Sequence, residues 1–168
     1  MLHIFITTML ILFTPETPTD WIDSNIDEVD RKAMQRLVGY SPTDLGSSGT
    51  WVSQEEITSW EELRGKVVII QSWNNGSPSG RLVVRAASKT LTRVKDKESI
   101  VLVLVHTPDK HEKAKTYIER NRIKSPAVVD TTGIICNSLG FYKKPSNILI
   151  DKNGRVRHVG LKIKYLTD

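Results

Sequence analysis

Cysteine and histidine, the side chains most often used for nucleophilic catalysis and for zinc binding, are few in this sequence. The 168 residues contain one cysteine, Cys136, and four histidines, which are His3, His106, His111 and His158. A single cysteine excludes an intramolecular disulfide and a cysteine-based zinc cluster, and the histidines lack the spacing of metal ligands. We therefore expect no metal and no cofactor, and two candidates for chemistry remain: the thiol of Cys136 and the hydroxyl of Ser77.

Ser77 stands where a turn gives way to a helix. It follows Asn74-Asn75-Gly76 and precedes Pro78. A serine at the N-cap accepts a hydrogen bond from an amide of the first turn, and a proline at the first helical position lacks only an N–H without an intrahelical partner. Helix N-terminal amides can also bind an oxyanion, but a nucleophilic serine needs a positioned base, for which His106 is the candidate. We expect Ser77 to be a helix cap.

Cys136 lies in an apolar stretch, between Ile134-Ile135 and Leu139. A cysteine in such surroundings behaves as a small hydrophobic core residue. The alternative is a redox-sensing thiol, or one that forms an intermolecular disulfide, and either role needs exposure and a lowered pKa.

A buried strand delivers the chain to the turn before Ser77. The run at 67–70 is unbroken and β-branched, which is typical of a strand buried on both faces, and Trp73 follows it. Apolar residues at helical spacing predict a helix from 78 to about 95. A second apolar run at 100–105 and a helix at 109–121 complete a β-α-β crossover, which makes the two strands parallel.

The C-terminal part predicts shorter elements. A brief strand is expected at 125–130 and a short helix at 133–139. The segment 146–160 has two apolar runs around Asn153-Gly154, the pair most typical of a tight hairpin turn.

The chain before these elements has an organisation of its own. Its expected divisions are a signal-like or membrane-anchor segment at 1–14, a linker at 15–20, an N-terminal helix and loop at 21–49, and a main domain at 50–168. The first segment has the length of the hydrophobic region of a secretory signal, and it is shorter than the roughly 20 residues that span a bilayer. We expect an exported, periplasmic or extracytoplasmic protein; the alternative is an uncleaved anchor whose residues 2–13 contact the membrane.

Apolar residues between Trp21 and Val38 follow a helical period. We expect this helix to pack on the domain beside its first strand, with a membrane-surface or partner-binding helix as the alternative.

The order of these elements resembles the thioredoxin superfamily, in its TlpA-like and redoxin-like branch. The resemblance rests on Gly65-Lys66-Val67-Val68, on Trp73, on Ser77-Pro78-Ser79-Gly80-Arg81 in place of the family's C-x-x-C-R, and on Leu149-Ile150-Asp151 before the hairpin turn. It spans about residues 50 to 160. It implies an α/β thioredoxin-like fold, with a central mixed β-sheet flanked by helices on both faces, to which this chain adds an N-terminal helix. Family members usually end in a helix that covers one sheet face, and either residues 162–168 or the N-terminal helix would cover it here.

The resemblance also shows what is missing. Disulfide exchange needs a thiolate at a helix N-terminus and a second thiol to resolve the mixed disulfide. The two positions hold Ser77 and Gly80, so the redox site is degenerate, and Cys136 is the one remaining thiol.

A peptide-binding groove could be present even though the redox cysteines are absent. Pro145 resembles the family's cis-proline. That proline faces the active-site corner, which here is the turn at 74–76 and the helix start at Ser77, and it presents the preceding backbone to an extended substrate. The expected groove residues are Trp73, Asn75, Ser77, Pro78, Arg81, Tyr142, Lys144 and Pro145. If the bond before Pro145 is cis, such a groove could pair with a peptide through backbone hydrogen bonds. Trp73 could instead pack in the core, and the basic side chains could be ordinary solvated charges.

The formal net charge of +5 comes without an aromatic-interleaved basic stripe or a nucleic-acid motif, so no nucleic-acid partner is expected. The leading hypothesis is a redox-inactive domain, not an enzyme, that binds a protein or peptide. The alternative is a thiol-disulfide or peroxide-linked oxidoreductase that acts through Cys136 or a partner's thiol. A purely structural or assembly role is the third hypothesis.

Overall fold

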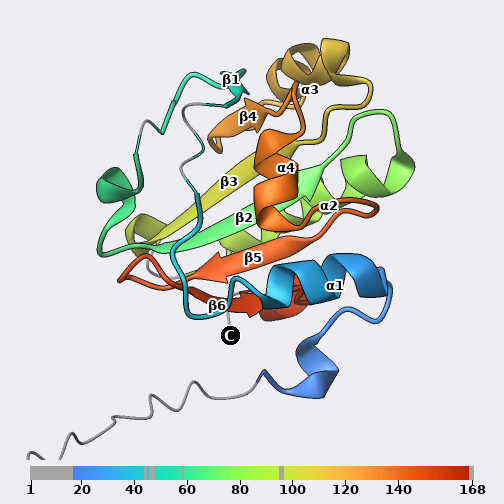
Figure 1. The fold of residues 1–168 in the computed structure, drawn as a ribbon. Coiled ribbons are helices and arrows are strands. Elements are labelled where there is room, and N and C mark those ends of the chain that lie inside the picture. The colour runs from blue at the N-terminus through green and yellow to red at the C-terminus, as the bar shows by residue number, and fades with distance from the viewer. Residues whose placement is uncertain (1–16, 44, 46–47, 58, 95–96, 167–168) are drawn as a thin grey trace, which may run out of the picture.

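The computed structural model describes residues 17–43, 45, 48–57, 59–94 and 97–166 (Figure 1). The expected signal-like segment at 1–14 and the first two linker residues lie outside this part of the chain.

A six-stranded mixed sheet forms the centre of the molecule, in the order β1-β4-β3-β2-β5-β6 (Figure 1). The strands are β1 (Thr50–Trp51), β2 (Val67–Trp73), β3 (Ile100–His106), β4 (Ala127–Val129), β5 (Asn147–Ile150) and β6 (Val156–Val159). The central strands β2, β3 and β4 are parallel, while β1, β5 and β6 run antiparallel to their neighbours. The β-α-β crossover and the C-terminal hairpin are therefore present. The hairpin loop at 151–155 is longer than the tight turn that Asn153-Gly154 predicts, because Gly154 has a positive φ but Asn153 does not.

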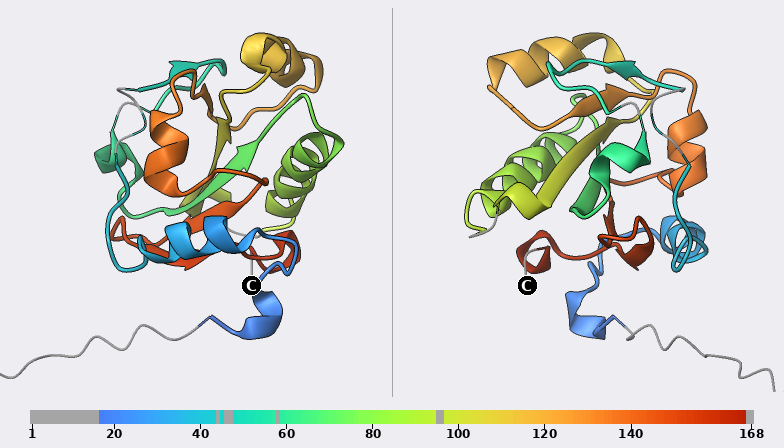
Figure 2. Two further views of the ribbon diagram at one scale, coloured as in Figure 1. Left: turned by 45° about the vertical axis from the view of Figure 1, so that its right-hand side comes forward. Right: turned by 90° about the vertical axis from the view of Figure 1, so that its left-hand side faces the viewer.

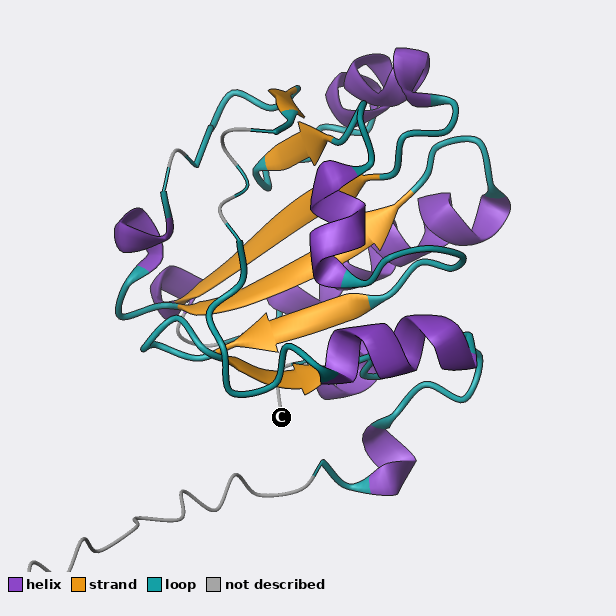
Figure 3. Ribbon diagram, in the orientation of Figure 1, coloured by secondary structure: helices purple, strands orange, loops and turns teal. Residues whose placement is uncertain are grey.

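Helices cover both faces of this sheet (Figures 2 and 3). The α-helices are α1 (Glu28–Gln35), α2 (Pro78–Leu91), α3 (Ala114–Arg120) and α4 (Ile134–Leu139). Short 3-10 helices are η1 (Thr19–Trp21), η2 (Trp60–Leu63), η3 (Lys97–Ser99), η4 (His111–Lys113) and η5 (Ile163–Tyr165). Side chains of β2 alternate between two cores: Val68 and Ile70 pack with residues of α1 and α4, and Ile69 and Trp73 pack with residues of α2 and α3. This is the expected thioredoxin-like architecture with an added N-terminal helix.

The N-terminal helix is shorter than the predicted 21–38. Asp27 caps α1 by accepting a hydrogen bond from the amide of Val29, so the helix begins only at Glu28. Before it, Ile22 forms an antiparallel bridge with Leu161, which uses this apolar residue outside a helix. The helix packs on the domain as expected, but it contacts β6, at the opposite edge of the sheet from β1.

Both candidate covers for the sheet are present, on opposite faces. The short η5 lies against α2, and its Tyr165 stacks on Trp21 with ring centroids 5.3 Å apart. Met34 of α1 is fully buried in the core of the other face. None of the described helices combines the length and apolar character that a membrane crossing requires.

Candidate functional site

Ser77 is the N-cap of α2. Its Oγ accepts a hydrogen bond from the amide of Gly80 at 3.0 Å, and Pro78 occupies the first helical position. The serine therefore completes the helix start, as its sequence context predicts.

Asn74 and Asn75 hold the turn before this cap. The Asn74 side chain donates to Thr107 Oγ1 at 2.9 Å and to the carbonyl of Asp109, and it accepts from the amide of Gly76. The carbonyl of Asn75 accepts from the guanidinium of Arg81 at 2.7 Å. Both asparagines thus hold the loop against the ends of neighbouring elements.

His106 lies fully buried under the same turn. Its Nε2 accepts from the amide of Asn75 at 3.0 Å and also contacts Asn75 Oδ1, while its Nδ1 lies 2.6 Å from the carbonyl oxygen of Thr107, to which it donates in the neutral Nδ1–H tautomer. Burial lowers the pKa of His106, so the neutral imidazole is favoured. Because both ring nitrogens are engaged within the loop, His106 does not serve as a base for Ser77.

Gly80 leaves no room for a side chain at the second redox position. A Cβ built there would lie 2.2 Å from the carbonyl oxygen of Asn74 and 2.6 Å from its nitrogen. Contacts this close require the loop to move. The glycine and the loop conformation therefore depend on each other.

Cys136 lies away from this corner. It sits in α4 and packs in the core of the sheet face opposite α2. The side chain is 4% exposed, and its amide donates to Asp130 Oδ2 at 2.7 Å. Burial, followed by the negative charge of Asp130, raises the pKa of this thiol far above its ordinary value. These properties match a small core residue and oppose a reactive thiol.

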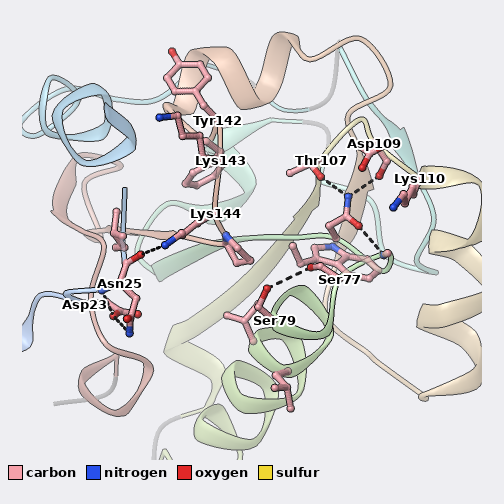
Figure 4. A pocket seen from close by; sticks show the side chains of 18 of the residues that line it. Asp23, Asn25, Ser77, Ser79, Thr107, Asp109, Lys110, Tyr142, Lys143 and Lys144 are labelled. Carbon is pink, nitrogen blue, oxygen red and sulfur yellow. Dashed lines mark hydrogen bonds between the residues drawn. The ribbon is translucent and has the colours of Figure 1, made fainter. Parts of the chain in front are cut away.

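A groove of about 990 Å³ opens beside the corner (Figure 4). Five of the expected residues line it, namely Trp73, Ser77, Tyr142, Lys144 and Pro145, while Asn75, Pro78 and Arg81 are not among its lining residues. Trp73 is fully buried, and its ring forms a T-shaped contact with the ring of His106, with the ring centroids 4.5 Å apart. Trp73 therefore packs as a core residue beneath the groove. Its indole N–H has no hydrogen-bond partner among the described residues.

Several groove residues escaped the sequence reasoning. Leu82, one of the apolar residues at helical spacing in α2, is 64% exposed and lines the groove. Asp23, Asn25 and Ile26 form part of the wall, although they come from the N-terminal segment. Figure 4 shows Lys144 extended toward Asn25, whose carbonyl accepts from its ammonium at 3.1 Å. The apolar character of Ile26 was visible in the sequence, but its helical spacing predicts a place in the N-terminal helix and not in a groove wall.

The backbone before Pro145 is already occupied. The bond preceding Pro145 is trans, so the resemblance to a cis-proline fails. One carboxylate oxygen of the fully buried Asp30 accepts from the amides of Lys143 at 3.0 Å and of Lys144 at 3.1 Å. We call this arrangement the Asp30 clamp. The two amides are therefore not free to pair with an extended peptide.

The N-cap residue of α1 also neutralises one of the basic side chains that line the groove. The ammonium of Lys143 forms an ion pair with Asp27 at 3.2 Å. Among the residues that the structure describes, no group of three or more His, Cys, Asp or Glu side chains is arranged to hold a metal ion.

Solved structures that resemble this chain include proteins named as thiol-disulfide isomerases or disulfide oxidoreductases. A thiol-disulfide isomerase from Corynebacterium glutamicum is 26% identical, with a TM-score of 0.58 over 67% of this chain and 80% of that one. The thioredoxin domain of a thiol-disulfide oxidoreductase from Bacteroides vulgatus is 22% identical, with a TM-score of 0.62 over 76% and 92%. A secreted disulfide oxidoreductase from Mycobacterium tuberculosis is 14% identical, with a TM-score of 0.57 over 70% and 84%.

The search of curated proteins gave no match. A family model, described as the AhpC/TSA family, matches residues 47–159, which is most of the chain and includes the corner at Ser77 and the loop at Pro145. The chain therefore belongs to the AhpC/TSA family of thioredoxin-like redoxins, of which it is a member with a single cysteine.

Proposed function

We propose that this protein is a redox-inactive redoxin domain that binds a protein or peptide partner in the groove beside its degenerate corner. The observation that carries the proposal is the groove itself, which lies next to Ser77 and Pro145. The corner that would hold a redox site keeps its helix cap and an ordered loop but contains no thiol.

The loss of thiol chemistry has support from both candidate positions. Ser77 carries a hydroxyl that is already used as a helix cap, and Gly80 carries no side chain. Cys136 is buried in the opposite core and favours its protonated form. No described feature therefore favours the oxidoreductase alternative through Cys136.

Binding in this groove would rely on the partner's side chains. The Asp30 clamp occupies the amides of Lys143 and Lys144, which removes the strand pairing that the sequence suggested. Exposed apolar surface remains at Leu82 and at Tyr142, which is 50% exposed. We infer that the partner inserts an apolar side chain against these residues, because burying them releases apolar surface from water.

A peptide library selected against the full chain tests this proposal. We expect enriched peptides to share an apolar anchor, and Leu82→Asp to weaken their binding by about tenfold or more, since a charge would replace buried apolar contact. Val29→Asp is the matched control, because Val29 is an aliphatic helix residue that is 53% exposed and does not line the groove.

Two results would overturn the proposal. One is a selection that yields no peptide binding below about 100 µM, an affinity already weak for a specific complex. The other is a set of peptides that bind the Leu82→Asp variant as tightly as the unchanged protein.

A further inference from the structure

A second pocket, of about 790 Å³, lies at the other end of α2. It is bounded by the last turn of α2, by the chain that follows α3 at 121–126, and by the first residues of β3. It shares no lining residue with the groove near Ser77. Its size falls within the usual range for sites that bind small molecules.

The walls of this pocket are mostly apolar. They are formed by Leu91, Val94, Ile100, Val101, Leu102, Ile123 and Pro126. Several of these side chains are only partly buried, so the pocket exposes apolar surface that an apolar ligand would remove from water.

Three cations surround these walls. Arg85, Arg122 and Lys124 line the pocket, and Glu55 is the sole carboxylate among its described lining residues. None of the three takes part in an ion pair within the described part of the chain, and Arg85 donates only to the side chain of Asn121 at 3.2 Å. The whole of α2 contains no acidic residue, so no negative charge on that helix offsets these three cations.

One polar atom of a residue that lines this pocket also lacks a hydrogen-bond partner among the described residues. The hydroxyl oxygen of Ser88 is buried and has no hydrogen-bond partner among the described residues. Ser88 lines the same pocket. The structure therefore holds an unused O–H donor next to the pocket.

We propose that this pocket binds a free anionic amphiphile, namely a long-chain carboxylate. Its alkyl chain lies against the apolar walls, and its carboxylate meets Arg85, Arg122 and Lys124. An alkyl chain needs no hydrogen bonds, whereas an acidic peptide would bring backbone N–H and C=O groups against walls that offer them few partners.

Calorimetric titration of the full chain with dodecanoate, below the concentration at which it forms micelles, tests the proposal. We expect saturable binding of one equivalent, and binding that is weaker by about tenfold or more for dodecanol, acetate and inorganic phosphate, which each lack the charge or the chain. The double variant Arg122→Gln/Lys124→Gln should weaken dodecanoate binding by about tenfold or more.

Lys113→Gln/Lys115→Gln is the matched control, since it removes the same charge from exposed residues that do not line the pocket. It should leave the affinity within about twofold. Amide NMR shifts caused by dodecanoate should centre on Ser88 and Ile123, not on Ser77.

Several results would overturn the proposal. Binding that does not saturate, equal losses in the two double variants, or shifts centred on the groove near Ser77 would each do so. Equal binding of inorganic phosphate would mean a simple anion site. Tighter binding of an acidic peptide, or of vesicles containing anionic phospholipid, would mean a different class of partner.

Discussion

His106 connects the degenerate corner to the sheet through both of its ring nitrogens. Nε2 accepts from the amide of Asn75, and Nδ1 donates to the carbonyl of Thr107. A protonated ring would lose the bond from the amide of Asn75, although its Nε2 could then donate to Asn75 Oδ1, and it would carry a charge in a fully buried place. Burial therefore favours the neutral ring in the folded protein.

This preference for the neutral ring predicts a pH dependence of stability. Burial lowers the pKa of His106 in the folded protein below its unfolded value of about 6.5, so the unfolded chain binds more protons between the two values. The free energy of unfolding should fall as the pH drops through about 6.5 toward the folded pKa. Urea unfolding between about pH 8 and pH 5 measures this fall, which should be smaller in His106→Gln.

His158 is the necessary control, because burial lowers its pKa as well. His158→Gln should remove a separate part of the pH dependence. An NMR titration that places the pKa of His106 at or above its ordinary value would contradict this account.

Two neighbouring elements pack so closely that the second redox position is closed. The loop at Asn74 touches the place that a Cβ at Gly80 would fill. We expect Gly80→Ala to lower the free energy of unfolding by about 1–3 kcal/mol, as overpacking does. Ser79→Ala, one residue earlier in α2 and exposed, should change it by less than about 0.5 kcal/mol. Chemical denaturation of both variants checks the difference, and equal stabilities would show that position 80 is open.

Helix α1 fixes the loop before Pro145 through the Asp30 clamp. Asp30→Ala would leave the amides of Lys143 and Lys144 without their acceptor, which should cost about 2–4 kcal/mol of unfolding free energy. Asp27→Ala loses a helix cap and an exposed ion pair, which should cost about 1 kcal/mol. Urea unfolding compares the two variants. A larger loss for Asp27→Ala would contradict the clamp.

Local patterns in the sequence predicted the elements that are defined by local contacts. The apolar runs of β2 and β3, the Ser-Pro start of α2 and the Asn-Gly hairpin are all present. The length of α1 was predicted wrongly, because Ile22 and Ile26 have helical spacing but make contacts outside the helix, Ile22 with Leu161 and Ile26 in the groove wall.

The clamp and much of the groove could not be predicted in this way. Asp30 accepts from a backbone amide 113 residues later in the chain, and a backbone amide leaves no mark on the sequence. The exposure of Leu82 likewise depends on what packs against α2, since its spacing alone predicts an inward side chain.

At the scale of the whole molecule, the groove and the cationic pocket lie at opposite ends of α2. The groove lies at its N-terminal end, near Ser77, and the cationic pocket lies at its C-terminal end, near Leu91. The thiol lies on the other side of the sheet, in the core under α4. This arrangement keeps the one cysteine away from both surfaces.

The most direct test of the central claim is disulfide-reductase and peroxide-reductase turnover by the full chain, measured beside Cys136→Ser. We predict no turnover above the buffer rate in either protein, because the corner has no thiol and Cys136 is buried with a raised pKa. Turnover in the unchanged protein that disappears in Cys136→Ser would contradict the account and identify a redox enzyme that works with one cysteine.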